Sequence, residues 1–186
     1  MLFLSVRRKP PTAMSEPLVL KRPPTDRVGR ALLAATKAFA LAGGLVLIAL
    51  TLMSLASVVG RAVFTKPLPG DYELIQLGCA VAVAAFLPFC QMRGGHVLVD
   101  FFTMNSRPAV RAALDTLGAL LVGIAAAVFT WRLTAGAIGL QQANDQTTIL
   151  EIPTWDAVAL MVPSFALFSL AGFYTAWVHW RSRHAT

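Results

Sequence analysis

Apolar residues gather in four long stretches that are separated by short polar connectors. The stretches are Ala38–Gly60, Leu74–Met92, Thr116–Trp131 with Leu133–Leu140 behind Arg132, and Ala157–Val178. A helix of about 20 apolar residues spans the hydrocarbon core of a bilayer and satisfies its own backbone hydrogen bonds there. The pattern therefore predicts an all-α integral membrane protein with four transmembrane helices.

The connectors predict where these helices turn. Thr65–Gly70 contains two prolines and a glycine, which break a helix, and Pro108 and Pro153 stand where the third and fourth helices should begin. The segment after Arg93 starts with two glycines and continues with apolar residues. It predicts a short interfacial helix between helices two and three.

Composition leaves no room for a soluble domain, because 56% of the 186 residues are hydrophobic and only 13% are charged. We expect a disordered basic cytoplasmic tail over residues 1–30, a four-helix transmembrane domain over 31–180 and a cytoplasmic tail over 181–186.

Basic residues crowd onto alternate ends of the four stretches. Thirteen of the 16 lysines and arginines lie before the first stretch, between the second and third, or after the fourth. Cytoplasmic loops carry such an excess, so both termini should be cytoplasmic. The net charge of +7 then reflects orientation in a membrane, and we expect no nucleic-acid partner.

Candidate metal, haem and thiol chemistry is weak. Cys79 and Cys90 both fall in the second stretch, about 16 Å apart on a helix, which is beyond disulfide reach. His96, His179 and His184 stand at span ends instead of the mid-membrane positions that would ligate a haem. We therefore predict no metal site, no cofactor and no catalysis.

Ionisable residues inside the stretches are few, and they stand near the predicted outer surface. Arg61 ends the first helix and Glu73 begins the second, so a short turn brings them close enough to form a charge pair. Arg132 lies in the outer part of the third helix and can join this cluster or reach lipid headgroups. The middle of the membrane holds no carboxylate, which argues against a self-sufficient proton or sodium pump.

On the cytoplasmic side, Arg93 ends the second helix, and His96 and Asp100 follow. His96 and Asp100 are four residues apart, so on a helix they share a face and can form a structural pair. The candidate structural or interface residues are thus Arg61, Glu73, Arg93, His96, Asp100 and Arg132.

Short motifs at the span ends carry a family resemblance. In chain order they are Val59-Gly60-Arg61, Asp71-Tyr72-Glu73-Leu74, His96-Val97-Leu98-Val99-Asp100, and Ile152-Pro153-Thr154-Trp155. In this order, on a four-span chain, they resemble the small membrane subunit (DctQ type) of a tripartite ATP-independent periplasmic, or TRAP, transporter. The resemblance covers roughly residues 31 to 180.

The resemblance implies a function and a set of partners. In that family a periplasmic substrate-binding protein delivers a small organic anion, often a carboxylate, to a large membrane permease subunit that also carries the coupling-sodium sites. The small subunit acts as a scaffold in the bacterial inner membrane, among membrane lipids. A dicarboxylate, a sugar acid and a 2-oxo acid are equally open as substrates. The alternative hypothesis is a four-helix membrane anchor subunit of a respiratory or redox complex.

Overall fold

The computed structural model describes residues 26–64, 69–93 and 108–183. Its helices are α1 (Arg27–Phe64), α2 (Asp71–Met92), α4 (Pro108–Ala143) and α5 (Thr154–Arg183). Each is long and apolar enough to cross a membrane. No strand occurs in these ranges beyond one isolated bridge between Gln146 and Pro153. The expected all-α, four-span membrane protein is confirmed.

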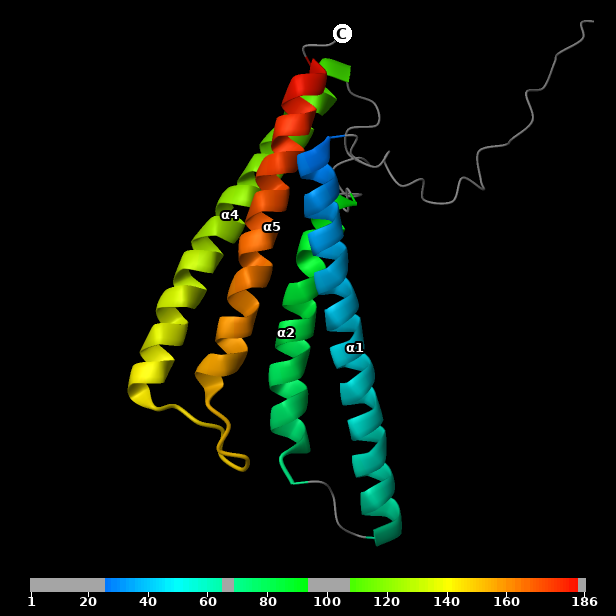
Figure 1. Ribbon diagram of the computed structural model, residues 1–186, viewed down its shortest axis with the longest axis vertical. Coiled ribbons are helices and arrows are strands. Elements are labelled where there is room, and N and C mark those ends of the chain that lie inside the picture. Colours follow the sequence, from blue (N-terminus) through cyan, green and yellow to red (C-terminus); the bar gives the residue numbers. More distant parts are fainter. Residues whose placement is uncertain (1–25, 65–68, 94–107, 184–186) are drawn as a thin grey trace, which may run out of the picture.

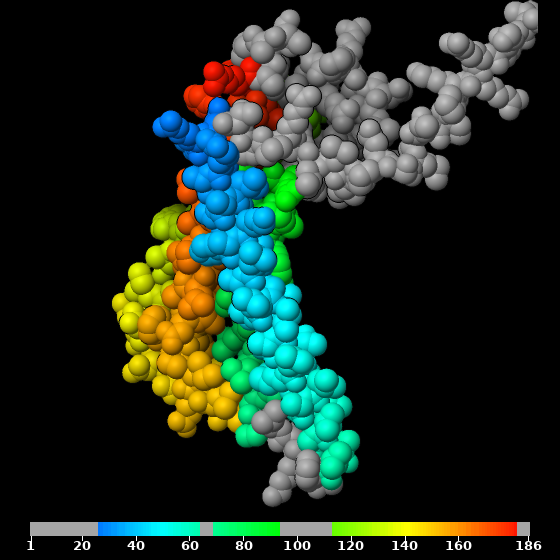
Figure 2. Space-filling model, turned by 45° about the vertical axis from the view of Figure 1, so that its right-hand side comes forward, coloured from blue at the N-terminus to red at the C-terminus, as the bar shows by residue number. Residues whose placement is uncertain are grey.

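The four helices form a single layer in the order α4, α5, α2, α1 (Figure 1). Among the described helices, α4 contacts only α5, and α1 contacts α2 along its length and α5 slightly. Helices α1 and α4 are therefore the two edges of the layer. Figure 2 shows α1 in front, with α5 and α4 to its left.

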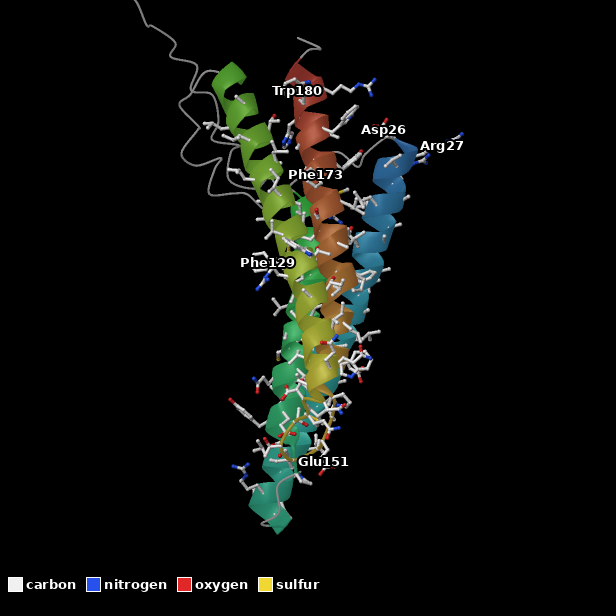
Figure 3. All side chains as sticks on the ribbon, turned by 90° about the vertical axis from the view of Figure 1, so that its left-hand side faces the viewer. Asp26, Arg27, Phe129, Glu151, Phe173 and Trp180 are labelled. Atoms are coloured by element: carbon white, nitrogen blue, oxygen red, sulfur yellow. The ribbon has the colours of Figure 1, made fainter. Side chains whose placement is uncertain are left out.

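The layer has two ends. Helix α1 begins and α5 ends at one of them, which we call the terminus end (Figures 1 and 3). The other, the loop end, carries Gly70 and the connection between α4 and α5. The predicted interfacial helix, with His96 and Asp100, lies outside the described residues.

The seam between α1 and α2 repeats every seven residues. Gly43 meets Ala85, Leu50 meets Gly78, and Ser57 meets Asp71, so both helices advance in steps of seven. Gly29 and Thr36 continue the row on α1 and are buried. A seven-residue repeat keeps one stripe facing a neighbouring helix, as in a coiled coil. Small side chains on this stripe let the two backbones approach.

The seam between α4 and α5 is tighter still. A Cβ placed on Gly172 would lie 2.7 Å from the Cα of Gly123. The buried hydroxyl of Ser169 donates a hydrogen bond of 3.0 Å to the carbonyl of Gly123, and Ala119 and Ala126 are buried on the same side of α4. In lipid, where apolar surfaces gain little from hiding from water, this close packing and the polar bond hold the helices together.

Helices α1 and α2 form one hairpin, and α4 and α5 form a second. Between the two hairpins, α2 packs on α5 near the terminus end. The buried Gln91 side chain donates through Nε2 to the hydroxyl of Thr175, 3.2 Å away. Ala84, Pro88 and Ala171 are also buried. Toward the loop end the axes of α2 and α5 diverge (Figure 1), so other contacts must join the hairpins there.

Candidate functional site

The connection between α4 and α5 is a folded loop, residues 144–153. Asn144 ends α4 with φ 51°, and the amide of Asp145 donates to the carbonyl of Leu140 at 3.2 Å. A left-handed residue just past the last turn is a common way to end a helix. Beyond it the amide of Thr147 donates to the carbonyl of Ile152 at 3.0 Å, which turns the chain back on itself.

Two threonines close this loop. The hydroxyl of Thr147 accepts the amide of Ile152 at 3.0 Å. Thr154, the first residue of α5, donates its hydroxyl to the Asp145 carboxylate at 2.7 Å and its amide to the Asp145 carbonyl at 3.1 Å. The end of α4 and the start of α5 are therefore linked by side-chain bonds as well as by the chain.

Glu73, in the first turn of α2, holds the loop from the other hairpin. Its Oε1 accepts the amide of Ile149 at 2.9 Å, and its Oε2 accepts the amide of Leu150 at 3.1 Å. A carboxylate that receives two backbone N–H groups makes charge-assisted hydrogen bonds, which are stronger than neutral ones. This contact ties α2 to the loop where the helix axes have diverged.

Gly70 supports the same contact. It precedes α2 in the left-handed conformation, with φ 77°, and it faces Leu150. A Cβ at this position would collide with Cγ of Leu150. Only glycine offers both the positive φ without strain and the space that Leu150 occupies.

Asp71 binds the other way, toward α1. Its Oδ2 accepts the hydroxyl of the buried Ser57 at 2.5 Å, and its Oδ1 accepts the amide of Tyr72 at 2.8 Å. The two acids of the first turn of α2 thus have different tasks. Asp71 joins α2 to α1, and Glu73 joins α2 to the loop before α5.

The predicted site residues are distributed over both ends of the layer. At the loop end, Arg61 stands in the last turn of α1, and the Glu73 oxygens face the loop amides. At the terminus end, the Arg93 guanidinium lies over the Phe89 ring, 4.9 Å from its centroid. The Nε of Arg93 is buried and has no hydrogen-bond partner among the described residues. Arg132 is exposed on α4, apart from both groups.

This arrangement is suited to holding helices. No group of three His, Cys, Asp or Glu side chains that could hold a metal ion occurs in the described part of the chain. Cys79 and Cys90 are free thiols. The carboxylates with hydrogen bonds at the loop end, Asp71, Glu73 and Asp145, each bind backbone or hydroxyl donors from another segment.

The loop contact makes a testable prediction. In Glu73→Gln the charge is lost and an amide NH₂ replaces one acceptor, so the amides of Ile149 and Leu150 should exchange hydrogen several-fold faster. Hydrogen–deuterium exchange of the protein in nanodiscs measures this. Glu151→Gln, on the same loop, is the matched control and should leave the exchange unchanged. Equal effects of both substitutions would show that the Glu73 contact does not hold the loop.

The seam between α1 and α2 was not predicted, although the sequence contains a signal for it. Gly29, Thr36, Gly43 and Ser57 are small residues at multiples of seven along α1, and they mark the seam with α2. The partners of Glu73 could not be found in this way, because backbone amides carry no residue-specific signal.

Comparison with protein families gives one match. The family described as "Tripartite ATP-independent periplasmic transporters, DctQ component" matches residues 50–182, which is more than half of the chain. The matched range includes the loop-end contacts, α2, α4 and almost all of α5. Comparisons with individual curated proteins and with solved structures gave no significant match.

Proposed function

Since the chain belongs to the DctQ-component family of tripartite ATP-independent periplasmic transporters, we propose that it is the scaffold on which the large membrane subunit is held. The transporter would take up a small organic anion, a carboxylate, by sodium-coupled symport. The periplasmic substrate-binding protein would deliver the anion to the large subunit, which carries the transport chemistry.

The observation that carries this proposal is the position of the carboxylates. In the described helices, Asp71, Glu73 and Asp156 lie at the loop end and Asp115 lies near the terminus end. None lies at mid-layer, where an ion-coupled carrier would need one to bind sodium or a proton inside the membrane. A layer of small-residue seams and end contacts suits a fixed support and not a moving carrier.

Orientation follows from the charges at the two ends. The described residues carry their basic side chains mainly at the terminus end, among them Arg27, Arg30, Arg93 and Arg181. The excess of Lys and Arg on cytoplasmic segments supports a cytoplasmic terminus end and a periplasmic loop end in the bacterial inner membrane. Two pairs then stay predictions for this subunit: Arg61 with Glu73 at the outer surface, and His96 with Asp100 at the inner surface.

Reconstitution tests the function. Vesicles that contain both membrane subunits, supplied with the binding protein, should accumulate the substrate when an inward sodium gradient is imposed. Vesicles that lack this chain should lose that uptake. Dicarboxylates, sugar acids and 2-oxo acids are the substrate classes to compare. Uptake that persists at the full rate without this chain would refute the scaffold function, and uptake indifferent to sodium would refute the coupling.

A further inference from the structure

We propose that the α4 edge of the layer is the docking surface for the large membrane subunit, and that Arg132 binds a carboxylate on a helix of that subunit. This inference rests on the proposed function, because it names which side of the scaffold meets its partner. The docking surface is the face of α4 defined by Gly118, Ala125, Arg132, Gly136 and Gly139.

Arg132 lies well inside the layer. Phe129, one turn away on α4 and near mid-layer in Figure 3, contacts Phe165 of α5 with ring centroids 5.8 Å apart. Phe165 is 11 residues from the start of α5 at Thr154, and Arg132 is three residues closer to the loop end than Phe129. Arg132 is therefore about eight residues from the level at which α5 starts. At 1.5 Å per residue, this places it about 12 Å inside the layer, measured from the start of α5 toward the terminus end.

A guanidinium at this depth on an edge helix needs an acceptor. The side chain of Arg132 is exposed, and among the described residues no carboxylate forms an ion pair with it. Charged side chains in membrane helices almost always face protein or a water-filled cavity and pair with another group. A carboxylate on a neighbouring helix is the complementary charge, and a bidentate contact is the geometry that arginine favours.

The surroundings of Arg132 suit a helix as the neighbour. Gly118, Ala125, Arg132 and Gly139 are spaced seven apart and share one face of α4, on which Gly136 also lies. A Cβ at any of the three glycines would meet nothing within 4 Å. In contrast, Gly43, Gly78, Gly123 and Gly172 are each filled by an adjacent helix of this chain.

The opposite edge has another character. The exposed face of α1 is a row of large aliphatic side chains, and no charged residue stands between Lys37 and Arg61. Such a surface is matched to lipid tails. The exposed members of this row are Leu41, Leu45, Ile48, Leu52, Leu55 and Val59. The α4 edge differs from the α1 edge in carrying Arg132 and three open glycines among its exposed apolar side chains, which include Leu121 and Val128.

Co-purification separates the two edges. The tagged chain is co-expressed with the large membrane subunit of the same transporter, and the amount of large subunit retained in mild detergent is measured. Gly136→Leu and Arg132→Gln should each reduce retention about tenfold, and Arg132→Lys should reduce it less. Gly44→Leu on α1 is the matched control, since Gly44 also has open space around it, and it should retain the large subunit fully.

Each outcome decides the proposal. Unchanged retention of the large subunit by Gly136→Leu and Arg132→Gln would overturn the proposal, and this is the result expected if Arg132 only reaches lipid headgroups. Loss of the large subunit in Gly44→Leu alone would also overturn it. A melting temperature of the isolated chain that is equal in all variants shows that losses are not due to misfolding. If the unmodified chain retains no large subunit, the proposed function itself fails.

Discussion

Replacing Gly172 with alanine is expected to lower the free energy of unfolding by about 1–3 kcal/mol, because the added methyl group would overpack the seam between α4 and α5. The new Cβ would stand 2.7 Å from Cα and 2.8 Å from N of Gly123. These are backbone atoms, so no side chain can rotate away and the helices themselves must separate. Separation would also lengthen the hydrogen bond from Ser169 to the Gly123 carbonyl. Thermal unfolding of the isolated chain in detergent measures the loss.

Two substitutions on the partner helix calibrate this result. At Gly123 a Cβ would meet the Phe173 amide nitrogen at 3.2 Å, and at Gly118 it would meet nothing within 4 Å. The expected order of destabilisation is Gly172→Ala, then Gly123→Ala, with Gly118→Ala neutral or slightly stabilising. Equal unfolding temperatures of Gly172→Ala and Gly118→Ala would contradict the close approach of α4 and α5 at Gly172.

Replacing Gly70 with alanine should cost about 2–4 kcal/mol, since backbone strain and a collision act together. The residue has φ 77°, which an L side chain rarely adopts, and its Cβ would overlap Leu150. The loop of residues 144–153 should detach from α2, so its amides should exchange faster while those in the α4–α5 seam stay protected.

The two causes can be separated by a double-mutant cycle. Leu150→Ala removes the group that the new Cβ would strike but leaves the backbone strain. Gly70→Ala combined with Leu150→Ala should therefore be less destabilised than the sum of the single variants. Strict additivity would mean that the packing of Leu150 on Gly70 does not contribute to the loop end.

The presence of the four membrane-spanning helices could be predicted from the sequence, because the length and apolar content of a stretch are enough to identify it. Leu74–Met92 was expected and α2 covers Asp71–Met92. The third helix does begin at Pro108 and runs through Arg132 without a break. Helix α1 starts at Arg27, ahead of the apolar stretch, because a helix does not need apolar residues once it leaves the lipid.

The order of the helices across the layer could not be predicted from length and apolar content. In lipid every face of a helix can be apolar, so no amphipathic stripe marks the side that packs. Small residues are an incomplete guide to the seam: on α4, Ala119, Gly123 and Ala126 lie in it, whereas Gly118 and Ala125, equally well spaced, do not. The pairing of Arg61 with Glu73 stays a prediction, and the hydrogen bonds that Glu73 makes to Ile149 and Leu150 use amides that any sequence would supply.

The layer consists of two hairpins, and this has a consequence for how it is made. The seam of α1 with α2 involves only residues up to 92, so a chain leaving the ribosome can complete the first hairpin before α4 has been synthesised. The contacts that join the hairpins can form only after the last third of the chain has been synthesised. They are the contacts of Gln91 with Thr175 and of Glu73 with the loop. The contacts therefore allow the two hairpins to form one after the other. Two separately expressed halves, divided between Arg93 and Pro108, should find each other in the membrane.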